Sequence, residues 1–163
     1  MTRLAVITFT LLLTLFSIHH ASADSTSETI KVASWNIAWL GSHEYNERKE
    51  SDYKKLAAYA IALNADVIAL QEVENGEWAK KVFGNDYDFY FTTRDWVQRV
   101  GIAVKKSSGL TVVAQEYKAL DVARVRNGME LTLSRNGKEL TLLAVHLKSG
   151  CFANPLDSKT VGD

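Results

Sequence analysis

The clearest hydrophobic pattern in the chain is a short apolar run, Val67 to Leu70, that ends in the polar pair Gln71 and Glu72. Turn-forming residues flank the run, so it predicts a strand that is buried on both faces. A carboxylate is rarely buried without a partner, so Glu72 is expected either at the mouth of a cleft or beside a cation. The pattern also allows a simpler interpretation, in which the strand surfaces at its end and exposes Glu72.

Patterns typical of a strand and of a helix precede this run. Residues 30–35 alternate as a strand that ends at Asn36, and residues 37–50 show no regular pattern. An amphipathic pattern predicts a helix over residues 52–63, capped by Ser51 and stopped by Asn64. Strand, helix and strand in this order predict a layered α/β (α+β) fold.

Further elements are predicted beyond Glu72. A short helix is expected over residues 75–83, stopped by Gly84. Strands are predicted over residues 87–92, 101–104, 110–116, 129–134 and 139–147. Asn136-Gly137 lies between the last two strands and is a strong signal for a tight hairpin. After Leu147 the pattern stops and the sequence becomes rich in turn residues.

Residues 1–23 have the three parts of a secretory signal peptide. Arg3 is the charged region, Leu4 to Ile18 is the apolar region, and Ala21-Ser22-Ala23 is a cleavage site. The apolar run is short for a membrane anchor, and the small residues favour removal. We therefore expect cleavage after Ala23, and a mature chain, residues 24–163, that is secreted or periplasmic and has no stable membrane insertion.

Composition and charge add little specificity. The length of 163 residues favours one domain. Removal of Arg3 with the signal leaves 18 basic and 19 acidic residues, a net charge of −1, so no basic excess indicates nucleic acid. A bound metal could still supply positive charge locally. Cys151 is the only cysteine, which in an oxidising compartment suggests a missing partner, a dimer or a free thiol.

Three predicted strands end in polar side chains with chemical potential: Asn36, Glu72 and His146. Functional groups gather where several strands of a layered fold end and their loops begin. His146 shares a face with apolar residues, so it also fits a structural histidine in the core. Asn36 alone says little, because turns favour asparagine.

The local sequences around these residues resemble a known family. They read SWNI (34–37), DVIALQEV (66–73) and AVHLKSGC (144–151). In this order and at these spacings they resemble the endonuclease/exonuclease/phosphatase family, which includes the pancreatic-type deoxyribonucleases and the abasic-site repair endonucleases. The segment QRVGIAVK (98–105) looks like the strand between the second and third motifs of that family. The resemblance runs from about Ile30 to Asp157.

The resemblance implies a four-layer αββα sandwich and a Mg²⁺-dependent hydrolase of phosphoric esters, with Mn²⁺ or Ca²⁺ as alternative ions. It implies that Glu72 binds the metal, that Asn36 lies near the metal and the phosphate, and that His146 faces the phosphate and assists proton transfer. Arg126 matches a position where the family often has a phosphate-facing arginine. A metal on a carboxylate would offset charge on the leaving oxygen, and an imidazole can donate a proton near neutral pH. A solvated surface position explains Arg126 equally well. Plausible substrate contacts, each better explained as ordinary structural or surface residues, are Tyr90, Arg94, Trp96 and Arg99.

The family's second half is not recognisable in this sequence. Its Gly-Asp-Phe-Asn-type motif and terminal Asp-His pair have no match, and no strand pattern leads into Gly162-Asp163. We therefore expect residues 24–163 to form a truncated N-terminal half of the sandwich, with Cys151 paired to a cysteine of the missing half. This half should be inactive alone and fold poorly.

The leading hypothesis is an exported phosphodiesterase or endonuclease that acts on nucleic acid or another phosphodiester. Two alternatives stay open. One is a non-catalytic truncated scaffold or binding module. The other is a hydrolase of the same family that acts on a lipid or inositol phosphate, which the near-neutral charge allows.

The signal sequence makes a direct prediction about the mature terminus. Mass spectrometry of the protein from its native host should find an N-terminus at Asp24, because the small residues before it fit a signal-peptidase site. An intact Met1 terminus recovered from the cytoplasm would contradict export.

Overall fold

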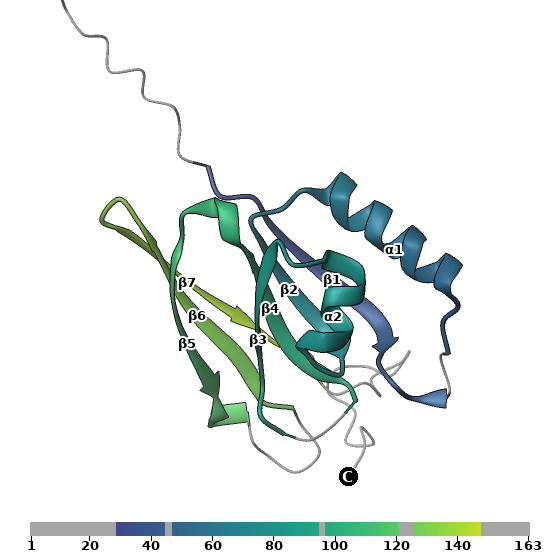
Figure 1. Cartoon of the computed structure of the whole chain (residues 1–163). Helices are drawn as coiled ribbons and strands as arrows, with labels where there is room; N and C mark the ends of the chain where they lie inside the picture. The colour runs from purple at the N-terminus through teal and green to yellow at the C-terminus, as the bar shows by residue number, and fades with distance from the viewer. Residues whose placement is uncertain (1–28, 45–46, 95–96, 121–125, 148–163) are drawn as a thin grey trace, which may run out of the picture.

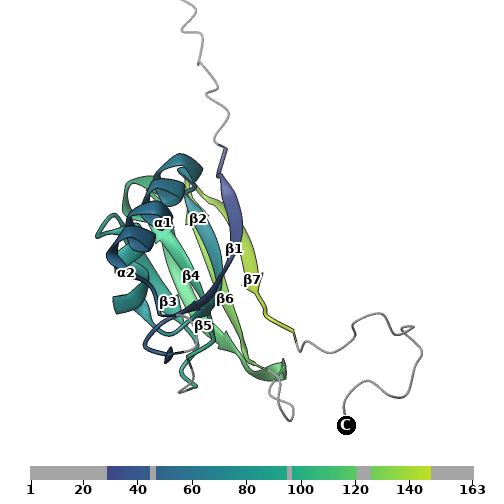
Figure 2. The same cartoon turned by 90° about the vertical axis from the view of Figure 1, so that its right-hand side faces the viewer.

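Two β-sheets lie face to face, and two helices cover the outer face of the first sheet (Figure 1, Figure 2). The computed structural model describes residues 29–44, 47–94, 97–120 and 126–147. These residues build three layers, namely helices, first sheet and second sheet, so the predicted α+β sandwich class is confirmed as a partial sandwich. None of the described helices is long and apolar enough to cross a lipid bilayer.

The first sheet has the strand order β1-β2-β4-β3. Its strands are β1 (Val32–Leu40), β2 (Val67–Val73), β3 (Tyr87–Phe91) and β4 (Arg99–Lys105). Strand β2 lies parallel to β1 and antiparallel to β4, so it has neighbours on both sides. Every β2 residue except Glu72 is buried, which confirms the strand predicted from the apolar run.

Strand β1 runs further than the sequence predicted. It was expected to end at Asn36, but it continues to Leu40 through an irregularity in its pairing with β2. Ala38 and Trp39, within that irregularity, have left-handed backbone angles with φ of 52° and 62°. Ile37 and Leu40 are buried on either side of them. The burial of these two side chains holds the end of β1 in place. The alternation of apolar and polar residues breaks at this point, so the sequence pattern did not predict that β1 continues past Asn36.

Helix α1 (Glu50–Leu63) begins two residues before its predicted start. The predicted cap Ser51 lies inside the helix, and the chain enters it at Lys49, whose backbone N–H donates to the Asp52 carboxylate at 3.0 Å. The acidic side chain in the first turn thus replaces the expected serine cap. Asn64 ends the helix in the left-handed conformation, as predicted.

Helix α2 (Gly76–Phe83) agrees with its prediction. The Asn75 side chain accepts hydrogen bonds from the N–H groups of Glu77 and Trp78, and Gly84 ends the helix at φ of 67°. The face of α2 toward the first sheet is buried. Both helices therefore press on the side of β2 opposite the second sheet.

The second sheet contains β5 (Thr111–Tyr117), β6 (Gly128–Arg135) and β7 (Lys138–Ala144), paired antiparallel in that order. Asn136 and Gly137, both with positive φ, form the predicted two-residue hairpin. Strand β7 ends at Ala144 rather than Leu147, so His146 follows the strand instead of lying on it. The printed register of β6 and β7 ends at the pair Met129–Ala144, whereas Gly128 at the start of β6 pairs with Tyr117 of β5.

Two hydrophobic clusters hold the layers together. One lies between the helices and the first sheet, and the other lies between the two sheets. Strand β2 contributes to both, with Ile68 and Leu70 toward the helices and Val67 and Ala69 toward the second sheet. The strand that carries Glu72 is thus fixed from both faces.

Four strands, β1, β3, β5 and β7, lie at sheet edges within the described part of the chain. Strand β1 pairs only with β2, and β7 pairs only with β6. Apolar side chains are exposed on these strands, including Val32 at 45% and Leu140 at 41%. Unpaired edges with exposed apolar side chains favour association between chains.

We expect the mature chain to associate with increasing concentration, and Leu140→Lys to reduce this association by placing a charge on the open edge. Sedimentation velocity over a concentration series would measure it. Ile61→Lys is the matched control, because Ile61 is 77% exposed on α1 and lies outside the strands of both sheets. A wild-type chain that stays monomeric throughout the series would contradict this prediction.

Candidate functional site

Asn36, Glu72 and His146 converge at one end of the two sheets. Asn36 Nδ2 donates to Glu72 Oε1 at 3.1 Å, and His146 Nε2 lies 3.6 Å from the same oxygen. The first two residues come from neighbouring strands of the first sheet, and His146 follows the last strand of the second sheet. The structure thus brings together the three residues that the sequence singled out.

The Glu72 backbone has an unusual conformation for a residue within a strand. Its φ is 61°, and the pairing of β2 with both neighbouring strands shifts register around it. A left-handed conformation costs a non-glycine residue roughly 1–2 kcal/mol. The Glu72 side chain is only 15% exposed, so the simpler interpretation of a strand that surfaces at its end is wrong.

The Asn36 amide has a fixed orientation. Its Oδ1 accepts a hydrogen bond from the Ala38 backbone N–H at 2.9 Å. The amide oxygen is therefore occupied by the chain's own backbone, and the amide nitrogen points toward Glu72. Asn36 thus donates a hydrogen bond to the mostly buried Glu72 carboxylate. A buried charge needs hydrogen-bond donors or a counter-ion, and this bond supplies one of them.

The surroundings of His146 lower its pKa below the ordinary value of 6.5. Burial lowers the pKa of its imidazole, the Arg126 guanidinium lowers it further, and the Glu72 carboxylate opposes both effects. The His146 Nδ1 atom is buried and has no hydrogen-bond partner within the part of the chain that the structure describes. Buried ring nitrogens are normally satisfied, so Nδ1 marks a place for a water or a further polar group.

Arg126 is held by a residue that sequence reasoning did not single out. Its Nε donates to the Gln98 backbone oxygen at 3.1 Å, and one of its terminal nitrogens, Nη2, donates to Gln98 Oε1 at 2.6 Å. Burial lowers the pKa of Arg126, the nearby Glu72 carboxylate counteracts this, and Arg94 adds to the lowering. The only sequence signal for Gln98 was its place at the start of the segment QRVGIAVK.

The structure places the other predicted substrate contacts in different surroundings. Tyr90 is half-buried and packs against the core between the sheets, and its role as a substrate contact stays a prediction. Arg94 is exposed and its charge reaches Arg126, whereas Arg99 donates to the Thr92 carbonyl at 3.4 Å. Trp96 lies outside the described residues, as do Cys151, the signal segment 1–23 and Gly162-Asp163.

Glu74, the second carboxylate at the end of β2, stabilises the loop that follows β1. It accepts a hydrogen bond from the Ser42 backbone N–H at 2.6 Å. A Cβ atom at Gly41 would come within 2.5 Å of Glu74 Oε2, so only glycine allows this close approach. Glu74 thus ties down the loop that follows β1, and its carboxylate is committed there.

The surroundings of Glu72 suit a hydrated divalent cation on one carboxylate better than a metal held by several protein side chains. Among the described residues, no group of three or more His, Cys, Asp or Glu side chains could hold a metal. Glu72 Oε1 is bonded to Asn36, whereas Oε2 has no hydrogen-bond partner within the same residues. Mg²⁺ binds through one or two carboxylates and retains several waters, so a single open carboxylate oxygen suits it.

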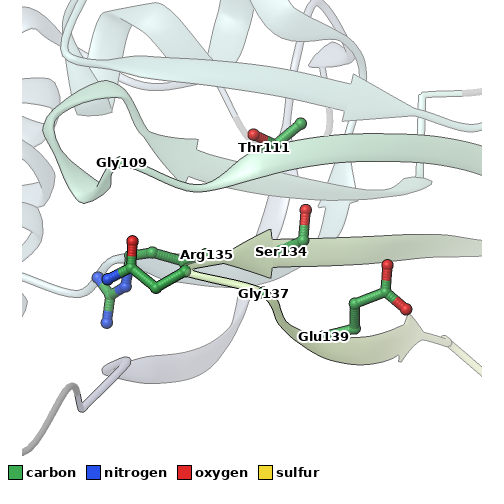
Figure 3. Close-up of a pocket in the computed structure, with 7 residues that line it drawn as sticks. Gly109, Thr111, Ser134, Arg135, Gly137 and Glu139 are labelled. Atoms are coloured by element: carbon green, nitrogen blue, oxygen red, sulfur yellow. The ribbon is translucent and has the colours of Figure 1, made fainter.

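One hollow of the structure lies away from these residues. It has a volume of about 720 Å³, lies beside the β6–β7 hairpin, and is lined by Thr111, Ser134 and Glu139 among others (Figure 3). Arg135 points away from Glu139 in Figure 3 and donates to the backbone oxygens of Ser108 and Thr29. The Arg135 guanidinium therefore links β6 to two other parts of the backbone. None of the predicted site residues lines this hollow.

Comparison with known proteins finds structural likeness only. No protein-family model matches the sequence, and no curated protein matches it significantly. A humanised D. rerio TDP2 (tyrosyl-DNA phosphodiesterase 2) with 14 mutations has a TM-score of 0.60 and 23% identity, over 76% of this chain and 49% of that one. A truncated Caenorhabditis elegans TDP2 has a TM-score of 0.58 and 24% identity, over 74% and 47%. D. rerio TDP2 complexed with single-strand DNA product has a TM-score of 0.58 and 22% identity, over 74% and 46%.

These likenesses show a shared fold. They agree with the layered sandwich fold expected from the sequence, and they do not single out the pancreatic-type deoxyribonucleases. The chain spans about half the length of the structures it matches.

The charges around His146 predict the direction of its titration. The midpoint should lie below the ordinary value of 6.5, Arg126→Gln should raise it, and Glu72→Gln should lower it further. Below pH 6.5 the unfolded chain then binds more protons than the folded one, so stability should fall as the pH falls through this range. Histidine NMR of the mature chain at low salt would measure all three midpoints.

Arg135→Gln is the matched control for Arg126→Gln, because it also removes a cation that binds backbone carbonyls, but at the hairpin end of the sheets. It should leave the His146 midpoint in place. An unchanged midpoint in both the Arg126 and the Glu72 variants would contradict the electrostatic arrangement described above.

Proposed function

We propose that this chain supplies the metal-binding and phosphate-facing half of an exported, metal-dependent phosphodiesterase that acts on DNA. The cluster of Asn36, Glu72 and His146 supports this proposal, as does the fold shared with TDP2 structures. One of those structures holds a single-strand DNA product, which supports a nucleic-acid substrate. Export rests on the signal sequence, residues 1–23.

The observation that carries the proposal is the state of the Glu72 carboxylate. It is mostly buried, held out of regular strand geometry, bonded through Oε1 to Asn36, and open at Oε2. A carboxylate in such a setting is expected to have a cation as its partner. A strained backbone at a buried charged residue is also more typical of functional sites than of structural ones.

A divalent cation on Glu72 would supply positive charge to the phosphate and to the leaving oxygen. Mg²⁺ is the expected ion, with Mn²⁺ and Ca²⁺ as alternatives. The chain's own residues perform the remaining tasks of orientation. Asn36 fixes the carboxylate, and a cation held by Glu72 would bring a phosphate close to His146 and Arg126.

Arg126 and His146 are suited to face that phosphate. Gln98 engages Nε and Nη2 of Arg126, and Nη1 has no partner among the described residues, so it can donate to a phosphate oxygen. The His146 Nε2 atom is the ring nitrogen that faces the Glu72 side of the site. In the protonated ring, the proton on Nε2 would be placed to reach the leaving oxygen, and donation would leave a neutral imidazole.

The described residues lack one part of the machinery. Hydrolysis needs a group that holds the attacking water in line and accepts its proton. No third acidic or histidine side chain joins Glu72 and His146 within the described part of the chain, and Glu74 is bonded to Ser42. We therefore propose that a complementary segment supplies this group, and that residues 24–163 alone are inactive.

The test is plasmid nicking with Mg²⁺ by residues 24–163 co-expressed with the C-terminal half of a TDP2-like relative. We call this pair the complemented protein. Glu72→Gln keeps the shape of the side chain and removes its charge, so it should lower the rate by roughly 10²–10³-fold, the scale of losing one electrostatic stabiliser. His146→Ala should cost a similar factor.

Glu77→Gln is the matched control, because Glu77 is 80% exposed on α2 and pairs only with Lys80 at the surface. It should leave nicking unchanged. Full activity in the Glu72→Gln variant would remove the metal assignment. Robust nicking by residues 24–163 alone would show that the site is complete within this chain, and cleavage of lipid or inositol phosphates in place of DNA would redirect the substrate.

A further inference from the structure

The segment directly after Asn36 is held in a conformation that it would not adopt by itself. Ala38 and Trp39 are consecutive residues with φ of 52° and 62°. L-residues other than glycine, asparagine and aspartate rarely take this left-handed conformation, and two in succession are rarer still. Some other part of the molecule must therefore stabilise this turn, which we call the β1 turn, residues 37–39.

Arg48 makes the contacts that stabilise it. One of its terminal nitrogens, Nη2, donates to the backbone oxygens of Ile37 at 2.5 Å and Ala38 at 2.7 Å. The other, Nη1, donates to the backbone oxygen of Trp39 at 3.0 Å. The half-buried guanidinium of Arg48 thus binds three consecutive backbone carbonyls. The left-handed backbone angles of Ala38 and Trp39 direct these carbonyls toward the same guanidinium.

Only arginine has the donors that this arrangement needs. The guanidinium is planar and presents a rigid fork of N–H groups, whereas the lysine ammonium is a single point charge on a flexible stem. Arg48 lies just before α1, and the helix fixes the position of its backbone. The contact therefore ties the end of β1 to the start of α1.

The β1 turn also sets the orientation of Asn36. The Ala38 backbone N–H donates to Asn36 Oδ1, which leaves Asn36 Nδ2 to donate to Glu72 Oε1. If the turn relaxed to ordinary angles, the Ala38 N–H would rotate away and the amide would lose its anchor. A continuous series of hydrogen bonds thus runs from Arg48 through the turn to the Glu72 carboxylate.

We propose that Arg48 is a positioning residue for the Glu72 site, because it holds the β1 turn that orients Asn36. The proposal rests on the proposed function only for the role of Glu72 as a metal ligand. Arg48 also lines a hollow of about 670 Å³ with Tyr53, Trp78 and Lys81, which raises the alternative that it binds a ligand there. Its donors, however, are directed at backbone carbonyls, and Lys81 covers the Trp78 ring at 3.4 Å.

The first experiment measures Mn²⁺ affinity of the complemented protein by calorimetry. Arg48→Lys keeps the charge but loses the fork, so it should weaken Mn²⁺ binding by about 10–100-fold, the scale of losing an outer-shell partner of a metal ligand. Arg135→Lys is the matched control, because Arg135 also binds two backbone carbonyls, those of Ser108 and Thr29, but beside the distant hairpin. It should leave Mn²⁺ affinity unchanged even where it lowers thermal stability.

The second experiment tests the turn itself. Glycine adopts left-handed angles without steric cost, so adding Ala38→Gly to Arg48→Lys should restore part of the lost Mn²⁺ affinity. Hydrogen exchange measured by mass spectrometry should show faster exchange over residues 37–41 in Arg48→Lys, and unchanged exchange over residues 67–70 of β2. Arg48→Ala should behave like Arg48→Lys, and the lysine variant keeps the test valid if the alanine variant does not fold.

Three outcomes would overturn the proposal: unchanged Mn²⁺ affinity in Arg48→Lys, an equal loss in Arg135→Lys, or unchanged exchange over residues 37–41. Loss of inorganic phosphate binding in Arg48→Lys with an intact β1 turn would favour the ligand-binding alternative instead. A wild-type protein that binds no Mn²⁺ would refute the proposed function, and the exchange measurement would then decide the role of Arg48 independently.

Discussion

A mostly buried carboxylate needs donors or a cation around it, and Glu72 imposes this requirement on the whole end of the sandwich. Strand β2 is packed from both faces, so the backbone cannot move to expose the charge. The surroundings supply the Asn36 amide, the His146 ring and the nearby Arg126 guanidinium instead. Each of these in turn depends on further contacts of its own, made by the β1 turn and by Gln98.

Much of this arrangement could be predicted from local patterns. The apolar run before Glu72 identified β2, because a strand buried on both faces leaves an unbroken hydrophobic stretch. Asn136-Gly137 identified the hairpin, since two consecutive positive φ angles favour these residues. The three site residues were found because each stands where a strand pattern ends, and the motifs around them resemble one family.

Other features depend on tertiary contacts that no local pattern records. Strand β1 continues past Asn36 because Ile37 and Leu40 are buried across a break in alternation. Strands β4 and β5 are separated by one short turn, yet they belong to different sheets. Arg48 and Gln98 act on backbone carbonyls and on other side chains, so neither their type nor their spacing distinguished them from ordinary surface residues.

The three site residues come from both sheets, so the site can form only when both sheets have folded and docked. Asn36 and Glu72 are 36 residues apart and meet when β1 pairs with β2, whereas His146 arrives only when the second sheet docks. Contacts between such distant segments form slowly, because the chain must close long loops before it gains the contacts. An unfolded chain would therefore carry all three side chains without their geometry. The site thus forms only in the last stage of folding, when the two sheets have docked.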